Sequence, residues 1–387
     1  MKVSSLFLGL LPLAGLTTAA PNGGGRGGKD PEVVAARRIN TLQKEYQKYV
    51  RQTIKHRTTG CTGNNILKRK EWSALSKTER ASYIAAVHCL ANAAGSTPVS
   101  EIPGARTRYD DFVGAHIQQT TFVHASGLFL GFHRYYVHLY EKALREECGY
   151  TGAQPYWDWT LSYNDPRLHP VFDGSDTSMG SNGIYDPNRP ATNITLPGGI
   201  SFSFPPATGG GCIKSGPFTA DKYEIRLGPV GYSPQGPQGG LGYNPRCLTR
   251  DLSLEQAAHC RPTNVTALLD GCQDLGCLNV QFDSASGGVH NTGHFQLGGI
   301  EFDVFASPSD PMFWLHHAQV DRIWTIWQSM DPKARINQVW GTGTAANIPP
   351  SDPVTLDSTI TFGVIHPPIT VGDVVSSIDG DMCYMYE

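Results

Sequence analysis

Charged side chains are scarce in this chain, and neither sign dominates. Asp, Glu, Lys and Arg make up only 17% of the 387 residues, and 31 basic against 34 acidic side chains leave a formal charge of −3. Without a long basic run, the chain lacks the electrostatic surface that nucleic-acid binding requires. Aromatic residues still make up 10% and hydrophobic residues 40%, which excludes a disordered chain as a whole and predicts a globular protein with a substantial core.

Long apolar runs are equally lacking, except at the N-terminus. Lys2 is followed by an apolar run from Leu6 to Leu16 and by small residues up to Ala20. Such a run is too short to span a bilayer, and its basic start and small-residue end are typical of a secretory signal peptide. We therefore expect residues 1–20 to be a signal peptide, the protein to be secreted, and no segment to cross a membrane.

Cysteine pairs with CxxC spacing are also absent. The nine cysteines are spread along the chain, and in the oxidising compartment of a secreted protein they predict disulfides rather than metal ligands. Because nine is odd, at least one thiol is left over, and Cys89, within an apolar helical stretch, is the first candidate for a buried free thiol. The spacing leaves the pairing open. Two sequons, at Asn193 and Asn264, predict N-glycosylation of a secreted product.

Helical patterns are recognisable over several stretches of the chain. Residues 21–36 include a Gly-rich stretch and are expected to form a flexible leader that can be trimmed, followed by one domain over 37–387. Apolar residues at helical spacing, a capping box and a proline at a helix start predict five helices. These cover approximately residues 39–54, 76–90, 112–119, 128–147 and 311–330.

The middle of the chain is rich in turn-forming residues. Between residues 164 and 245, 27 of 82 positions are Gly or Pro, compared with 43 of the other 305. This composition excludes long helices, yet aromatic residues such as Phe172 and Tyr223 provide apolar surface to bury. We expect ordered, irregular loops wrapped over a helical core rather than a linker.

Six of the thirteen histidines fall into two groups of three. The first group is His116, His124 and His133, and the second group is His290, His294 and His317. His290 and His294 are spaced i, i+4, which puts both imidazoles on one helix face, able to bind a single metal ion. His317 lies on a later predicted helix. His116 and His133 suit two further helices, whereas His124 is expected in a loop over 120–127.

Taken singly, each histidine has an ordinary alternative as a surface residue or a hydrogen-bonded core residue. That alternative is the default for His56, His169, His259 and His366. The two groups differ because aromatic, strongly apolar segments surround them, such as Phe313-Trp314-Leu315-His316-His317. Burying imidazoles there costs free energy unless each nitrogen finds a partner, and a metal ion is one such partner.

Two longer motifs around these histidines are similar to those of a known family. His124, the segment Phe129-Leu130-Gly131-Phe132-His133-Arg134 and Glu141 resemble the first copper motif of tyrosinases and catechol oxidases. The segment from Asp310 to His317, together with Asp321, resembles their second copper motif. Both patterns contain several residues and occur in the expected order.

Two further motifs extend the resemblance. Tyr156-Trp157-Asp158-Trp159 resembles the aromatic segment after the first copper motif, and Tyr384-Met385-Tyr386 resembles the tyrosine motif that closes the family's catalytic domain. The resemblance covers most of the mature chain and is nearest to short, secreted fungal members. It implies a mainly α fold, with a four-helix-bundle core that holds a dinuclear copper site and long irregular loops with a little β structure around it. Because the chain stops at Glu387, no C-terminal plug domain is expected.

The resemblance implies that each group of three histidines holds one copper ion of a type-3 dinuclear centre. His316 and Asp321 are then expected outside the ligand set, with Asp321 either accepting a ligand's ring N–H or forming a salt bridge on the helix surface. The implied reaction is the oxidation of ortho-diphenols, and of ortho-aminophenols as a further class, to ortho-quinones by O2. The partners are thus small phenols and O2. A tyrosinase that also hydroxylates monophenols is the main alternative, and a haemocyanin-like O2 carrier is a remote one.

Monophenol hydroxylation needs a group that removes the phenol proton. In the family this is attributed to a glutamate shortly before the first ligand of the second copper, acting on water with the asparagine after that ligand. Asn291 is present, but the preceding stretch contains Gln281 and Asp283 and no glutamate. If Gln281 takes that place, catechol oxidation should outrun hydroxylation; if Asp283 does, this argument weakens. Phe295, next to His294, is a candidate for the substrate entrance.

Overall fold

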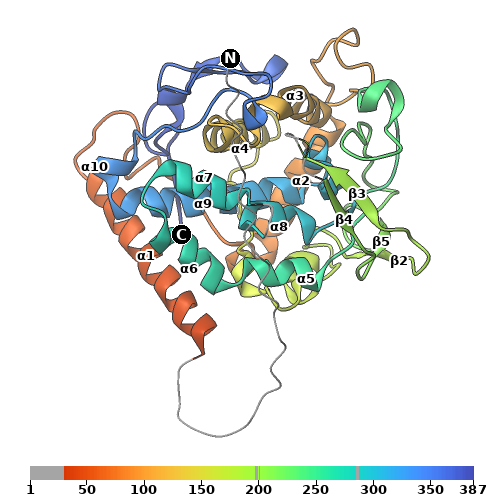
Figure 1. The fold of residues 1–387 in the computed structure, drawn as a ribbon, viewed down its shortest axis with the longest axis horizontal. Helices are drawn as coiled ribbons and strands as arrows, with labels where there is room; N and C mark the ends of the chain where they lie inside the picture. Colours follow the sequence, from red (N-terminus) through yellow and green to blue (C-terminus); the bar gives the residue numbers. More distant parts are fainter. Residues whose placement is uncertain (1–29, 197–198, 200, 285–286) are drawn as a thin grey trace, which may run out of the picture.

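A computed structural model describes residues 30–387 except 197, 198, 200, 285 and 286. The expected signal peptide and most of the expected leader lie outside the described residues. Helices dominate this part of the chain (Figure 1). In chain order they are α1 (Pro31–Ile54), α2 (Lys77–Asn92), α3 (Arg108–Val123), α4 (Phe129–Glu146), α5 (Leu254–Ala257), α6 (Pro262–Gly271), α7 (Leu275–Phe282), α8 (Val289–Phe295), α9 (Met312–Met330) and α10 (Pro332–Arg335).

Side-chain caps determine where α2 and α3 begin. α2 starts with the predicted capping box, in which Ser76 accepts a hydrogen bond from the Glu79 N–H and Glu79 accepts one from the Ser76 N–H at 2.7 Å. α3 starts with a second box, formed by Thr107 and Asp110. This box moves the start of α3 ahead of the predicted 112–119, and the helix continues to Val123.

α1 begins earlier than the sequence pattern indicated. Pro31 occupies its first turn, and the Asp30 carboxylate accepts a hydrogen bond from the Glu32 N–H at 2.9 Å. Residues 31–36 are therefore helical, and their assignment to a flexible leader was wrong. The physical reason is that an Asp-Pro pair at a helix start stabilises the first turn even where apolar periodicity is weak.

Four helices form the centre of the molecule. α3 packs on α4, α4 on α9, and α9 on α8, while α1 lies along another side of α9 (Figure 1). Between α4 and α9, the ring of Trp314 stacks on the ring of Tyr140 with centroids 3.8 Å apart. Nearly every side chain of α9 is buried. The predicted mainly helical fold with a bundle core is thus confirmed.

The strands form two-stranded pairs. β1 (Leu67–Arg69) pairs in parallel with β8 (Tyr384–Tyr386), and the antiparallel pairs are β2 (Gly183–Tyr185) with β5 (Gly210–Ile213), β3 (Thr192–Thr195) with β4 (Ser201–Phe204), and β6 (Thr359–Ile360) with β7 (Ile369–Thr370). β2 to β5 lie within the Gly- and Pro-rich region and at the edge of the molecule opposite α1 (Figure 1). Its described residues form these short strands, 3₁₀ turns and irregular loops around the bundle, as the composition indicated.

Eight of the nine cysteines form disulfides. The pairs are Cys61–Cys383, Cys89–Cys148, Cys212–Cys247 and Cys272–Cys277. The choice of Cys89 as the free thiol was wrong, because Cys148, just after α4, lies next to it in space although 59 residues away in sequence. The free cysteine is Cys260, which is buried behind α8 with its Sγ 3.3 Å from Thr292 Oγ1.

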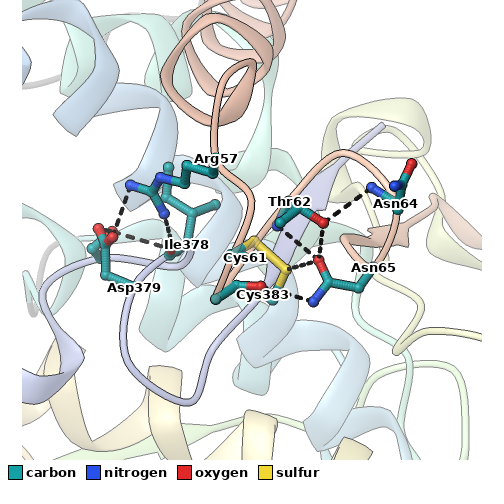
Figure 2. The surroundings of a disulfide bond; sticks show 10 residues. Arg57, Cys61, Thr62, Asn64, Asn65, Ile378, Asp379 and Cys383 are labelled. Atoms are coloured by element: carbon teal, nitrogen blue, oxygen red, sulfur yellow. Dashed lines mark hydrogen bonds and ion pairs between the residues drawn. A yellow bond between two sulfur atoms is a disulfide. The ribbon is translucent and has the colours of Figure 1, made fainter.

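The Cys61–Cys383 disulfide joins the segment after α1 to the residue that precedes β8 (Figure 2). Polar contacts support the same junction. The Arg57 guanidinium lies 2.8 Å from the Asp379 carboxylate and donates a hydrogen bond of 2.6 Å to the Ile378 carbonyl (Figure 2). The two ends of the described chain are therefore held together by a covalent bond and a parallel strand pair.

Candidate metal centre

The six histidines of the two groups come together in the helical bundle. His116 lies on α3, His124 directly follows it, His133 lies on α4, His290 and His294 lie on α8, and His317 lies on α9. All six side chains are buried, and in space they form the same two groups that the sequence indicated. The expected loop over 120–127 is shorter than predicted, because α3 runs to Val123 and His124 is its C-terminal cap.

Within each group the Nε2 atoms converge. In the first group, His133 Nε2 lies 3.4 Å from His116 Nε2. In the second group, His294 Nε2 lies 3.2 Å from both His290 Nε2 and His317 Nε2. One ring nitrogen from every member of a group lies within 4.8 Å of those of the other members, and in the second group this cluster also includes His316. Each group thus presents several ring nitrogens to one point in space.

In the first group, backbone carbonyl groups determine which ring nitrogen holds the proton. His116 Nδ1 lies 2.8 Å from the Phe305 oxygen, and His133 Nδ1 lies 2.8 Å from the Phe129 oxygen. His124 Nδ1 lies 3.0 Å from the carbonyl oxygen four residues earlier. A carbonyl oxygen can only accept a hydrogen bond, so each Nδ1 donates its proton and each Nε2 keeps a free lone pair.

In the second group, carboxylates replace the carbonyl groups. His290 Nδ1 lies 2.5 Å from Asp283 Oδ1, and His294 Nδ1 lies 2.6 Å from Glu301 Oε2. His317 Nδ1 is buried without a hydrogen-bond partner within the part of the chain that the structure describes. For His290 and His294 the donated Nδ1 proton again leaves the Nε2 lone pair free for a metal ion.

Burial keeps the imidazoles of this centre neutral. Desolvation lowers the pKa of His124 to about 4, and it holds the pKa of His116, His133, His294 and His317 well below the ordinary histidine value. Neutral imidazole is the form that binds a metal ion. Burial raises the pKa of Glu301, which has no access to water, well above its ordinary value.

The residues present fit one copper ion in each group. Where both rings donate their Nδ1 protons, as in the pairs His116–His133 and His290–His294, the Nε2 lone pairs face each other at 3.2 to 3.4 Å with no proton between them; they repel, and a cation at that point removes the repulsion. Three neutral imidazoles without a carboxylate ligand suit copper. The two groups also adjoin each other, because the His133 and His317 rings stack with centroids 4.2 Å apart.

His316 lies beside the second group but makes a different contact. Its Nδ1 accepts a hydrogen bond from Trp159 Nε1 at 3.1 Å. With Nδ1 as the acceptor, the proton lies on Nε2, so neither ring nitrogen has a lone pair left for a metal ion. This contact favours the expected place of His316 outside the ligand set. The ring packs directly on Gly293 of α8, one residue before His294.

Asp321 is bound to side chains other than the histidines. Its carboxylate accepts hydrogen bonds from Arg134 Nε at 2.6 Å, Tyr384 OH at 2.6 Å and Tyr386 OH at 2.7 Å. The expectation that Asp321 accepts a ligand's ring N–H was therefore wrong, and so was the alternative of a surface salt bridge, because the residue is buried. Its position on α9 directs it toward α4 and β8, where it neutralises Arg134 in the core.

Gln281 makes no hydrogen bond with the six histidines within the described residues. It is exposed on α7 and lines a surface pocket of about 440 Å³ that none of the six histidines lines. Its catalytic place stays a prediction that this exposed position does not support. Asp283, by contrast, contacts the metal centre directly. Its carboxylate contacts His290, and its carbonyl oxygen accepts a hydrogen bond from Asn291 Nδ2 at 2.9 Å.

Phe295 belongs to a small apolar cluster under the β3–β4 hairpin. Its ring lies 4.6 Å from that of Phe204 and 5.8 Å from that of Phe202, measured between centroids. Only 6% of Phe295 is exposed. Because one residue on a helix turns by about 100°, Phe295 points away from its neighbour His294. Its place at a substrate entrance stays a prediction, and the packing in this cluster favours a core role instead.

The two sequons lie in different surroundings. Asn193 is exposed on β3, and Asn264 is exposed in the first turn of α6. Asn264 Nδ2 donates a hydrogen bond to the His259 carbonyl oxygen at 2.8 Å. Glycosylation at both sites stays a prediction, and the exposure of both asparagines is compatible with it.

Glu301 is the residue of this centre that the sequence reasoning missed. It lies in a 3₁₀ turn (Gly299–Phe302) seven residues after His294, and its side chain is wholly buried. A lone acidic residue between Ile300 and Phe302 was the available signal, because a carboxylate in an apolar segment needs a buried donor. The Asp283 contact with His290 was likewise not anticipated, although both residues had been singled out.

Comparisons with known proteins agree on one family. A model of the common central domain of tyrosinase matches residues 106–330. The tyrosinase-like protein orsC of Emericella nidulans is 43% identical over 326 residues, covering 80% of this chain and 86% of that protein. Tyrosinase P of Aspergillus terreus is 39% identical over 332 residues, covering 82% of this chain and 91% of that protein.

A solved structure extends this likeness to the fold. A mutant polyphenol oxidase from Thermothelomyces thermophila superimposes with a TM-score of 0.85 at 39% identity, covering 91% of this chain and 98% of that one. The matched region of the family model contains all six histidines of the two groups. With the family model, the relatives and the fold in agreement, the chain belongs to the tyrosinase family of copper oxidases.

Proposed function

We propose that the first and second groups each hold one copper ion and that the protein oxidises ortho-diphenols to ortho-quinones with O2. The observation that carries this proposal is the contact between the two groups, in which His133 and His317 stack at 4.2 Å. Two copper ions held this way would supply the redox chemistry by which one O2 molecule is reduced to water while two diphenols are oxidised to quinones. Ortho-aminophenols have the same two adjacent donor groups and are the further substrate class.

The exposure of the site residues indicates the side from which a substrate approaches. His116 and His317 are 0% exposed and His133 and His290 are 2% exposed, whereas His124, His294 and Asn291 are 5%, 7% and 8% exposed. The less buried three define the open side of the centre. A planar diphenol that enters there meets both groups, because His124 belongs to the first group and His294 to the second.

Diphenol oxidation is favoured over monophenol hydroxylation by the state of the nearby proton acceptors. Gln281 lines a surface pocket that none of the six histidines lines, and an amide does not take up a proton. Asp283 Oδ1 is engaged by the His290 ring N–H, and the Asn291 amide is engaged by the Asp283 carbonyl group. Both groups are therefore already engaged when a monophenol must lose its proton. A diphenol depends less on such a base, because its second hydroxyl group lies next to the first and makes proton loss easier.

A tyrosinase with substantial monophenol hydroxylase activity is the second candidate. One observation favours it: the Asp283 side chain, which contacts His290, is 16% exposed. A relative that carries the name tyrosinase P is 39% identical. In this case Asp283 would take the phenol proton through a water molecule.

Oxygen uptake with matched substrates distinguishes the two candidates. We expect the copper-loaded protein to consume O2 rapidly with catechol and 2-aminophenol, and at least tenfold more slowly with the monophenol tyrosol. Comparable rates on tyrosol and catechol would contradict the diphenolase assignment. His133→Ala should abolish all three activities and lower the copper content below two ions per chain while retaining most helical signal, because it removes one ligand of the first group.

We also propose that the protein is secreted. Four disulfides support an oxidising compartment. Within the part of the chain that the structure describes, no helix combines the length and the apolar character needed to cross a membrane. Expression of the full chain in a fungal host, followed by N-terminal sequencing of the product in the medium, tests this: a mature N-terminus after residue 20 supports it, and retention of the uncleaved chain in the cells contradicts it.

A further inference from the structure

The two groups of histidines differ in what holds their Nδ1 protons. All three members of the first group donate to backbone carbonyl oxygens, which are neutral. Two members of the second group donate to carboxylates, at 2.5 Å for His290 and Asp283 and at 2.6 Å for His294 and Glu301. This difference is not a consequence of burial, because both groups are buried to a similar extent.

We propose that Asp283 and Glu301 are positioning residues that tighten copper binding by the second group alone, so that the two sites have unequal copper affinities. The inference rests on the proposed function only in taking copper as the metal, and it is independent of which phenol is oxidised. A carboxylate that accepts the ring N–H makes the imidazole a stronger donor and orients its Nε2 atom. The first group receives neither effect.

The two carboxylates reach the second group from separate elements. Asp283 caps the C-terminal end of α7, and Glu301 lies in the 3₁₀ turn Gly299–Phe302 after α8. They contact α8 at two residues that are one helical turn apart. The Glu301 side chain is 0% exposed, and its other oxygen has no hydrogen-bond partner within the part of the chain described here, so the His294 ring is its main polar contact.

The negative charge of the carboxylates also predicts tighter copper binding by the second group. A cupric ion in a group of three neutral imidazoles places two positive charges in the protein interior, which is costly without counter-charge. Asp283 supplies negative charge one imidazole ring away from the second group, and Glu301 does so when a bound cation keeps its buried carboxyl group ionised. No carboxylate contacts a ring nitrogen of the first group within the described residues: Asp321 pairs with Arg134, Glu141 pairs with Arg69, and Asp283 acts on His124 only through space.

The test measures copper affinity for each group separately. His116→Ala with His124→Ala leaves the second group as the only copper site, and His290→Ala with His294→Ala leaves only the first. In each background, Cu(II) affinity is determined by competition with a chromophoric chelator, and the electron paramagnetic resonance spectrum of the single bound ion is recorded. Asp283→Asn and Glu301→Gln are then introduced one at a time; both keep the shape and the acceptor oxygen and remove the charge.

We expect each amide substitution to weaken copper binding by the second group by about 10- to 100-fold and to shift the spectrum of its ion. The first group should retain its affinity within about twofold and its spectrum unchanged. Thr292→Val is the matched control, because it changes a buried side chain of α8 that bonds to the Gly288 carbonyl group rather than to an imidazole. It should leave both affinities unaltered.

Two results would overturn the inference while leaving the proposed function intact. One is an unchanged affinity of the second group in both amide variants. The other is an equal loss of affinity in both groups, which would mean that the carboxylates merely support the fold; thermal unfolding of each variant identifies that case, and Asp283→Asn, at a partly exposed site, is the variant less prone to it. Absence of copper binding in both backgrounds would overturn the proposed function together with this inference.

Discussion

Gly293 separates α8 from the ring of His316. A Cβ atom at this position would lie 2.0 Å from His316 Cε1 and 2.5 Å from its Nδ1. Helix propensity alone favours Gly293→Ala by about 1 kcal/mol. We expect the contact to outweigh the propensity, so that the variant is destabilised by about 1–3 kcal/mol and binds less copper in the second group. Thermal unfolding and copper analysis measure both effects.

Gly271 provides the matched control for that substitution. It is the last residue of α6, and a Cβ atom there would meet no atom within 4 Å. Gly271→Ala should therefore be neutral or slightly stabilising. If both variants behaved alike, close contact with His316 would not be the reason for glycine at position 293.

His138 gives the protein a pH dependence that is separate from the copper centre. Desolvation lowers its pKa to about 4 from the ordinary 6.5. The unfolded chain then binds a proton below pH 6.5 that the folded chain binds only near pH 4, so this contribution to stability is complete above pH 6.5 and is lost as the pH falls toward 4. Denaturant unfolding at pH 7, 6 and 5 should show a loss of up to about 1.4 kcal/mol per pH unit from this residue.

The variant His138→Gln isolates that contribution. A neutral amide has no proton to bind, so the variant should lose less stability than the natural protein between pH 6.5 and 4. Acid effects on the copper-binding histidines occur in both proteins and cancel in the difference. Parallel stability curves for the two proteins would show that His138 takes up its proton in the folded state as readily as in the unfolded chain.

At the scale of elements, β8 is attached to the bundle through one buried carboxylate. Tyr384 and Tyr386 lie on the same face of β8, two residues apart, and both donate hydrogen bonds to Asp321 Oδ2 on α9. Arg69 on β1 donates a hydrogen bond to the Tyr386 hydroxyl oxygen at 2.9 Å. A strand of three residues is thus held by side chains, because its few backbone hydrogen bonds are insufficient alone.

Removing one hydroxyl group tests this attachment. Tyr386→Phe leaves Asp321 with one donor fewer and Arg69 without one acceptor, and we expect a loss of about 1.5–3 kcal/mol in the free energy of unfolding. Met385→Leu, a change of similar volume at a buried neighbour that makes none of these hydrogen bonds, should cost less than about 1.5 kcal/mol. Urea unfolding of both variants measures the difference; equal losses would mean that packing, not the hydrogen bonds of Asp321, holds β8.

At the scale of the whole molecule, the disulfides close loops of very different length. Cys61 and Cys383 are separated by 322 residues, whereas Cys272 and Cys277 are separated by 5 (the first pair is shown in Figure 2). In the chain-entropy model, the longer loop contributes about 6 kcal/mol and the shorter about 2 kcal/mol. Replacing both cysteines of each pair by serine should therefore lower the unfolding temperature more for Cys61–Cys383.

The outcome of that comparison also tests how the chain ends are held. If the parallel pairing of β1 with β8 and the Arg57–Asp379 ion pair suffice to hold the ends, the two double variants will unfold at similar temperatures. A larger drop in unfolding temperature for the Cys61–Cys383 variant shows that this disulfide stabilises the protein by restricting the conformations of the unfolded chain. Differential scanning calorimetry at one scan rate measures both variants under the same conditions.

The sequence by itself determined the features that depend on neighbouring residues. The capping box at Ser76 and Glu79 and the i, i+4 spacing of His290 and His294 are local, so the start of α2 and the shared face of α8 followed from the chain alone. The motifs around His133 and His317 led to the family and to the mainly helical fold, because a multi-residue pattern of this kind is specific. The compositional bias of residues 164–245 likewise predicted their irregular loops.

Only the tertiary structure decided which distant side chains meet. Asp321 pairs with Arg134. Asp283 and Glu301, rather than Asp321, contact the imidazole rings of His290 and His294. Cys89 found a disulfide partner 59 residues away. Hydrogen bonds and disulfides need their atoms within a few tenths of an ångström and at set angles, and such placement depends on how helices pack and loops turn, which spacing along a chain does not specify.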